Sequence, residues 1–141
     1  MKSLNISTAS KESRCRRPLV TEALSAGFPS PADDFKELRI SLDKELINNE
    51  EATFFARVSG NSMINAGIED GDLLVIDRSI EFLDGKIAVC AIDGDFTVKR
   101  IKVEKKCVYL IPENYNYKPI KVTEDNEFII WGIITYVIKK V

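Results

Sequence analysis

Short apolar runs rich in Val, Ile, Phe and Tyr recur along the chain from about residue 52 onwards. Turn sequences built on Asp and Gly, such as EDGD, LDGK and IDGD, stand between several of them. Val, Ile, Phe and Tyr favour strands, and Asp-Gly pairs favour tight turns between strands. The runs are ATFFARV (52–58), DLLVID (72–77), KIAVCAI (86–92), FTVKRIKV (96–103), CVYLI (107–111) and EFIIWGIITYVIKKV (127–141). This pattern predicts a mainly β fold, a compact barrel or sandwich.

The part of the chain before these runs predicts little regular structure. SLDKELINNE (41–50) favours one short helix, with Ser41 as its N-cap and Glu45 in its first turn. GFPSPADDF (27–35) carries Gly and two prolines and therefore marks a boundary. Residues 1–26 are Ser-rich and show no sustained apolar period, so we expect a flexible or extended N-terminal arm followed by a β domain over residues 27–141.

Composition and charge narrow the class of protein. The 141 residues are 45% hydrophobic and 30% charged with a formal net charge of −2, which suits one globular core and offers no field for holding nucleic acid. Five basic and two acidic residues give the arm a charge of +3, which leaves −5 on the β domain. No apolar run reaches the roughly 18–20 residues of a membrane span, and no signal peptide is present. We expect a cytoplasmic protein that binds neither membrane nor nucleic acid directly.

The chain contains no His, and this absence removes several classes of site. Ser-His-Asp and Cys-His catalytic sites are excluded, and so are His-ligated metals. Cys15, Cys90 and Cys107 lack the spacing of a zinc site or a disulfide framework, so we expect reduced thiols, with Cys90 buried in a strand. We expect no metal and no cofactor.

Two residues remain as candidates for nucleophilic chemistry. Ser62 lies in the turn SGNSM, and without His its proton must pass to a Lys, Asp or Glu. Lys99 shares a strand face with Thr97 and Ile101, where loss of solvent would lower its pKa. Each residue also has an ordinary structural interpretation, in which Ser62 makes a local turn bond and Lys99 extends to water.

The paired sequences SGNSMINAGIEDGDLLVID and DGDFTVKRI, 59–77 and 93–101, resemble the self-cleaving Ser-Lys peptidase family of LexA-type and UmuD-type proteins. The resemblance covers the chain from about residue 23 to its end. It implies that Ser62 is the nucleophile and that Lys99 is the general base, which later protonates the leaving amine. Ser62 and Lys99 are 37 positions apart along the chain.

The resemblance also locates a substrate in the chain itself. It implies cleavage between Ala26 and Gly27 in ALSAGF, where the small side chain of Ala26 and the absent Cβ of Gly27 allow close approach to the carbonyl. We expect the backbone N–H groups of Asn61 and Ser62 to form the oxyanion hole.

Within this family the UmuD type is favoured, because 26 residues cannot hold a helix-turn-helix domain and because GFPSPADDF resembles the segment after the UmuD cleavage point. The resemblance implies an SOS function. A RecA–single-stranded-DNA filament would promote self-cleavage, and residues 27–141 would form a homodimer that joins a UmuC-like Y-family translesion DNA polymerase in mutagenic repair.

Alternatives remain open. The chain could be a repressor-type C-terminal dimerisation domain without its DNA-binding domain, or a non-catalytic β interaction module in which Ser62 and Lys99 are structural. A signal peptidase, which also uses Ser and Lys, would need a membrane anchor that this sequence lacks.

Overall fold

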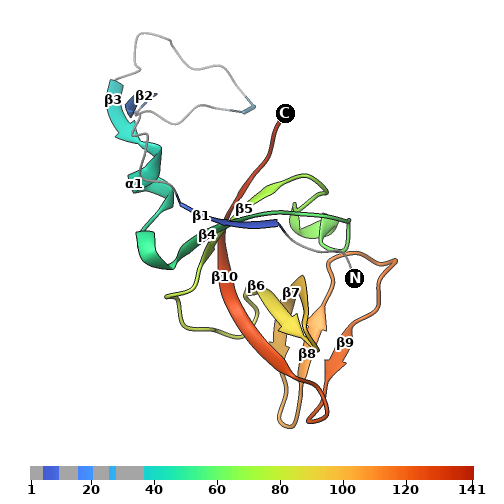
Figure 1. Ribbon diagram of the computed structural model, residues 1–141. Coiled ribbons are helices and arrows are strands. Elements are labelled where there is room, and N and C mark those ends of the chain that lie inside the picture. Colours follow the sequence, from blue (N-terminus) through green and yellow to red (C-terminus); the bar gives the residue numbers. More distant parts are fainter. Residues whose placement is uncertain (1–4, 10–15, 21–25, 28–36) are drawn as a thin grey trace. The chain divides into compact units, whose positions relative to one another are not determined.

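The computed structural model describes residues 5–9, 16–20, 26–27 and 37–141 (Figure 1). The chain divides into two units, each described by itself. We call residues 1–9 and 49–141 the core unit and residues 10–48 the hairpin unit. This division does not follow the expected boundary after residue 26, and the removal of residues 1–26 stays a prediction.

Strands dominate the described residues. The helical elements are α1 (Leu42–Leu46) and two 3-10 turns, η2 (Glu50–Ala52) and η3 (Ile64–Ala66). The strands are β1 (Asn5–Thr8), β2 (Arg16–Val20), β3 (Glu37–Ser41), β4 (Thr53–Arg57), β5 (Leu73–Asp77), β6 (Ile87–Ile92), β7 (Asp95–Val103), β8 (Val108–Ile111), β9 (Ile120–Val122) and β10 (Phe128–Ile138). The mainly β prediction is confirmed, and each of the six apolar runs contains a strand. No helix among the described residues has the length and apolar character needed to cross a membrane.

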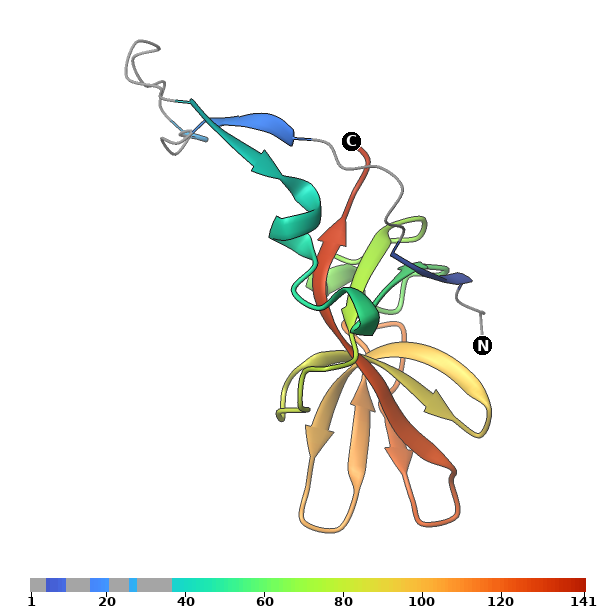
Figure 2. The same cartoon turned by 60° about the vertical axis from the view of Figure 1, so that its left-hand side comes forward.

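The core unit is built on one eight-stranded sheet in the order β1-β4-β5-β10-β6-β7-β8-β9, in which neighbours are antiparallel. The long strand β10 joins the two halves of this sheet. Its first part pairs with β6 and its second part with β5, and the register shifts once in each pairing. Such bulges bend a strand, and Figures 1 and 2 show β10 curving between the two halves.

Gly132 lies where β10 passes close to β5. A Cβ built at this position would lie 2.5 Å from Cγ2 of Ile76 on β5, which is closer than non-bonded carbon atoms approach. Gly132 therefore allows β10 to pack against β5 where the two halves of the sheet meet.

Two apolar clusters form the core. The first joins residues of β4 and β5 to residues near the expected site: Ala56, Val58, Met63, Ile68, Leu74, Ile76, Val89 and Val98. The second lies among β6 to β10: Ala88, Cys90, Ile92, Ile101, Leu110, Val122 and Ile133. Met63 and Val98 are direct sequence neighbours of Ser62 and Lys99, so the core holds the backbone at both candidate residues.

The N-terminal arm is extended where the structure describes it. β1 pairs with β4, and Ile6 of β1 lies opposite Ala56 of β4. The Ile6 side chain packs against the first cluster. In the hairpin unit, β2 pairs with β3. The sequence pattern did not reveal these short strands, because four or five residues with few apolar positions carry too little periodicity.

The predicted short helix is present as α1 in the hairpin unit. Ser41 occupies its N-cap position and Glu45 lies in its first turn, as expected. The position of the N-cap is therefore predicted correctly, but the Ser41 side chain makes no capping hydrogen bond.

Candidate active site

Ser62 lies in a turn between β4 and η3. Contacts of Val58, Gly60 and Met63 hold the backbone of this turn before and after the serine. Val58 N–H donates to the Asp72 carbonyl at 2.8 Å, and Gly60 N–H donates to Asp70 Oδ1 at 2.6 Å. Met63 is buried in the first cluster. Gly60 has a φ of 99°, a conformation that favours glycine. These contacts leave Ser62 half-buried between a constrained Gly60 and an anchored Met63.

Lys99 is buried in the middle of β7, with an exposed fraction of 7%. Its cross-strand partner on β6 is Ala88, and the partner of Thr97 is Cys90, both fully buried. The Lys99 side chain is buried on this face, so the alternative in which it extends into solvent is wrong. Burial lowers the pKa of Lys99 from its ordinary value.

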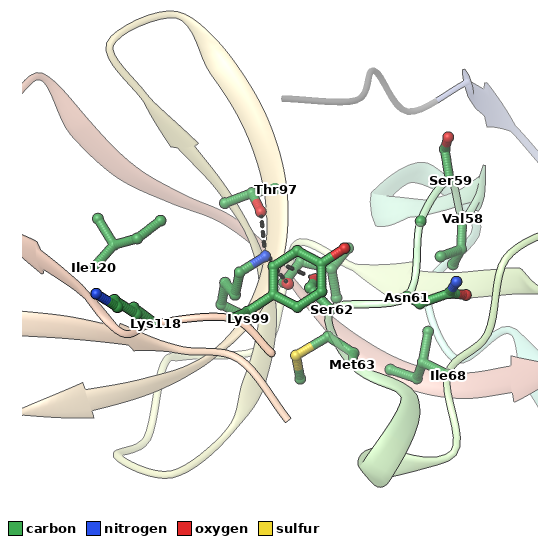
Figure 3. Close-up of a pocket in the computed structure, with 13 residues that line it drawn as sticks. Val58, Ser59, Asn61, Ser62, Met63, Ile68, Thr97, Lys99, Lys118 and Ile120 are labelled. Carbon is green, nitrogen blue, oxygen red and sulfur yellow. Dashed lines mark hydrogen bonds between the residues drawn. The ribbon is translucent and has the colours of Figure 1, made fainter. Parts of the chain in front are cut away.

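The structure brings Lys99 and Ser62 together (Figure 3). Lys99 Nζ lies 2.9 Å from Ser62 Oγ, 2.8 Å from Thr97 Oγ1 and 3.0 Å from the Val98 carbonyl oxygen. All three partners are uncharged oxygen atoms. None of them stabilises the ammonium form as a carboxylate would, which is consistent with the lowered pKa.

The three partners also decide where a neutral amine directs its lone pair. An ammonium has three N–H donors, whereas a neutral amine has two donors and one lone pair. The Val98 carbonyl can only accept, and the Thr97 hydroxyl can accept the second N–H. The lone pair is then left for the Ser62 hydroxyl, so this arrangement can take a proton from Ser62 Oγ.

A cavity of about 360 Å³ opens beside the pair. Apolar side chains form much of its wall, among them Val58, Ile68 and Ile120, while Tyr117 and Lys118 come from the loop between β8 and β9. Figure 3 shows Ser62 and Lys99 among these lining residues. A cavity of this kind suits an extended peptide segment with small apolar side chains.

The expected oxyanion donors line the same cavity. Within the described part of the chain, the N–H groups of Asn61 and Ser62 donate to no protein acceptor. They are therefore available to an external oxygen, and their role as an oxyanion hole stays a prediction.

Ala26 and Gly27 lie in the hairpin unit, in the connection between β2 and β3. Both are exposed and both lie in a bend. A Cβ at Gly27 would meet nothing within 4 Å, so this position has open space around it. The bond between Ala26 and Gly27 is therefore accessible, and its cleavage stays a prediction.

The cysteines fit their predicted structural role where the structure describes them. Cys90 is fully buried, and burial raises the pKa of its thiol to about 12. Cys107 is half-buried, and both thiols are free. Cys15 lies outside the described residues.

Sequence reasoning missed the residues that hold the site in place. It assigned Thr97 to the face of Lys99 but gave it no role, and it gave no role to the loop between β8 and β9. In that loop Glu113 O accepts from Asn65 N–H at 2.7 Å, and Asn114 Nδ2 donates to the Asn61 carbonyl at 2.7 Å. No local pattern could have revealed these contacts, because their partners lie about 50 positions apart.

Comparisons with known proteins agree with the geometry. The family model described as Peptidase S24-like matches residues 18–135. Protein MucA of Salmonella typhimurium is 39% identical over 120 residues, which cover 84% of this chain and 82% of MucA. Protein ImpA of Shigella flexneri is 38% identical over 125 residues, 88% of this chain and 84% of ImpA. LexA repressor 1 of Xanthomonas axonopodis pv. citri (strain 306) is 37% identical over 117 residues, 83% of this chain and 58% of the repressor.

These matches confirm the resemblance to LexA-type and UmuD-type proteins, and with it the expected function class of a serine peptidase of SOS mutagenesis. We conclude that this chain belongs to the Peptidase S24-like family of serine peptidases.

Proposed function

We propose that the protein cleaves its own chain between Ala26 and Gly27, with Ser62 as the nucleophile and Lys99 as the general base. The observation that carries this proposal is the 2.9 Å separation of Lys99 Nζ and Ser62 Oγ, in a site where the amine is buried and its three described hydrogen-bond partners are uncharged oxygen atoms. In a chain without His, this pair supplies both the nucleophile and the base.

The reaction begins with neutral Lys99. Its lone pair takes the Ser62 proton as Oγ bonds to the Ala26 carbonyl carbon, and the carbonyl electrons move onto the oxygen. The N–H groups of Asn61 and Ser62 stabilise that oxyanion. Collapse of the intermediate breaks the C–N bond, and protonated Lys99 passes its proton to the Gly27 nitrogen, which leaves as a new N-terminus. Water, activated by the same Lys99, then hydrolyses the ester on Ser62.

The biological setting follows from the family resemblance. A RecA–single-stranded-DNA filament would favour the arrangement in which the ALSAGF segment occupies the cavity. The filament would increase the fraction of molecules in this arrangement without adding catalytic groups. The product, residues 27–141, would act as a homodimer with a UmuC-like Y-family polymerase. Exposed apolar side chains at the end of β10, Val137 and Ile138, support an interface between protein chains.

Incubation of the purified protein at about pH 9.5 tests the proposal, since alkali favours the neutral amine. We expect two fragments, the larger with Gly27 at its N-terminus by mass spectrometry. Ser62→Ala and Lys99→Ala should each abolish cleavage, and their effects should not add, because the two residues act as one unit. Normal cleavage in either variant would remove the pair from the mechanism, and no cleavage of the wild type under any condition would favour the non-catalytic module.

A further inference from the structure

The peptide bond between Asn61 and Ser62 is held by a side chain from a distant loop. The Asn61 carbonyl oxygen accepts a hydrogen bond from Asn114 Nδ2 at 2.7 Å and a longer one from Ile64 N–H at 3.3 Å. Asn114 lies between β8 and β9, 53 positions further along the chain.

The direction of this carbonyl sets the direction of the Ser62 N–H. A peptide unit is planar, and in the trans form its C=O and N–H point to opposite sides. No described peptide bond is cis. With the Asn61 oxygen held toward Asn114, the Ser62 N–H points away from Asn114 and donates to no acceptor among the described residues.

Asn114 is itself well supported. Its Oδ1 accepts from Asn116 N–H at 3.0 Å, which orients the amide so that Nδ2 is the atom facing Asn61. The neighbouring Glu113 carboxylate accepts from Arg100 Nε at 2.6 Å, and Arg100 directly follows Lys99 on β7. The loop is thus attached to the strand that carries the base as well as to the turn that carries the nucleophile.

We propose that Asn114 is a positioning residue for the oxyanion hole: its amide holds the Asn61–Ser62 peptide with the Ser62 N–H turned to the place where the carbonyl oxygen of the scissile bond becomes negative. This inference rests on the proposed function and adds a residue to it. Without Asn114, the Asn61 carbonyl keeps only the longer bond from Ile64, and the exposed turn can rotate this peptide. A rotated peptide presents a carbonyl oxygen to the oxyanion and removes a donor.

The test compares two substitutions of the same kind. Asn114→Asp keeps the shape and keeps the Oδ1 acceptor for Asn116 N–H, but it replaces the Nδ2 donor with an oxygen that repels the Asn61 carbonyl. Asn116→Asp is the matched control, because it adds the same charge two residues away on an exposed side chain. Asn114→Ala removes the donor without adding charge.

We expect self-cleavage at about pH 9.5 to slow about 10- to 100-fold in Asn114→Asp and Asn114→Ala, and to stay within about twofold in Asn116→Asp. In Asn114→Ala the pH of half-maximal rate should not move, because the contacts of Lys99 are unchanged and no charge is added. The melting temperature should also not move, since the Asn114 side chain is partly open to solvent.

A second readout separates the oxyanion hole from docking of the cleavage segment. A small fluorophosphonate reacts at Ser62 without that segment: the Oγ–P bond forms, the P–F bond breaks, fluoride leaves and Lys99 takes the proton. Labelling followed by intact mass should slow by a similar factor in both Asn114 variants. Slowed cleavage with normal labelling would overturn the inference, and so would unchanged cleavage or a shifted pH midpoint in Asn114→Ala. Normal cleavage in Ser62→Ala would instead overturn the proposed function.

Discussion

At the scale of single residues, Lys99 shows how burial favours the neutral form of an amine, the form that a base requires. Its three partners are oxygen atoms without charge, so burial acts on its pKa without an opposing carboxylate among its hydrogen bonds. Loss of solvent disfavours the ammonium and lowers the pKa from its ordinary value. The neutral fraction, which is the reactive one, therefore increases as pH rises through a value below about 10.4.

The first prediction is a pH profile for self-cleavage of the purified protein. The rate should increase with pH and should level off once the pH passes the lowered pKa of Lys99, because the amine is then neutral. Intact mass or gel analysis of the uncut chain over time gives the rate at each pH. Ser62→Ala serves as the blank for contaminating proteases. A flat profile would contradict a titrating Lys99 as the limiting base.

The second prediction concerns Thr97, whose hydroxyl is one of the two groups that keep Lys99 aimed at Ser62. Thr97→Val keeps the shape but removes the acceptor, and the loss of one hydrogen bond of about 1 kcal/mol should lower the plateau rate roughly fivefold. Thr97→Ser retains the hydroxyl and should cleave at close to the wild-type rate. If Thr97→Ser loses as much activity as Thr97→Val, packing rather than the hydrogen bond explains the effect.

At the scale of elements, the contact of β1 with β4 gives the N-terminal arm a structural role. β1 ends the sheet, and without it the edge of β4 would carry unpaired backbone groups. Ile6 adds an apolar contact with the first cluster, while Ser7 on the same strand is exposed. The arm therefore stabilises the core unit as well as leading to the cleavage segment.

The third prediction follows from this contact. Ile6→Asp should lower the free energy of unfolding by about 1–3 kcal/mol, because it places a charge against the core. Ser7→Asp is the matched control and should change it by no more than about 0.5 kcal/mol. Urea unfolding followed by circular dichroism measures both, in a Ser62→Ala background so that the chain stays intact. Equal effects of the two substitutions would mean that β1 does not dock against the cluster.

At the scale of the whole molecule, self-cleavage requires a bond in the hairpin unit to reach a site in the core unit. The fourth prediction tests this with Gly27→Glu. Space around Gly27 is open, so the substitution should not disturb the fold, but its bulk and charge should exclude the bond from the mostly apolar cavity. Uncut chain should accumulate while fluorophosphonate labelling of Ser62 stays normal. Cleavage at the usual rate would mean that the bond lies elsewhere.

The fifth prediction concerns the fragment that cleavage leaves behind. Residues 1–26 include β1, which pairs with β4, and β2, which pairs with β3. After cleavage these non-covalent pairings would hold the fragment through its described residues. It should co-elute in part with residues 27–141 in size-exclusion chromatography and should be released more completely in Ile6→Asp. Full release from both proteins at high concentration would show that the pairing contributes no affinity.

The sequence alone determined the class of the protein. Alternating and continuous apolar runs between Asp-Gly turns specify strands locally, so six of the ten strands that the structure describes and the short helix could be predicted. The lack of His and the paired motifs around Ser62 and Lys99 pointed to one kind of chemistry. These signals are local or compositional, and each can be recognised without knowing which strands are neighbours.

Only the tertiary structure decided how the site is assembled. The 2.9 Å contact of Lys99 with Ser62 spans 37 positions, and the bond from Asn114 to Asn61 spans 53. The pairing of β1 with β4 brings residues about 50 positions apart into register. Such contacts depend on strand order and on the pairing of β10 with both β5 and β6, which joins the two halves of the sheet. Periodicity along a chain reports which face a residue occupies, whereas the partner on that face is selected by packing of the whole sheet.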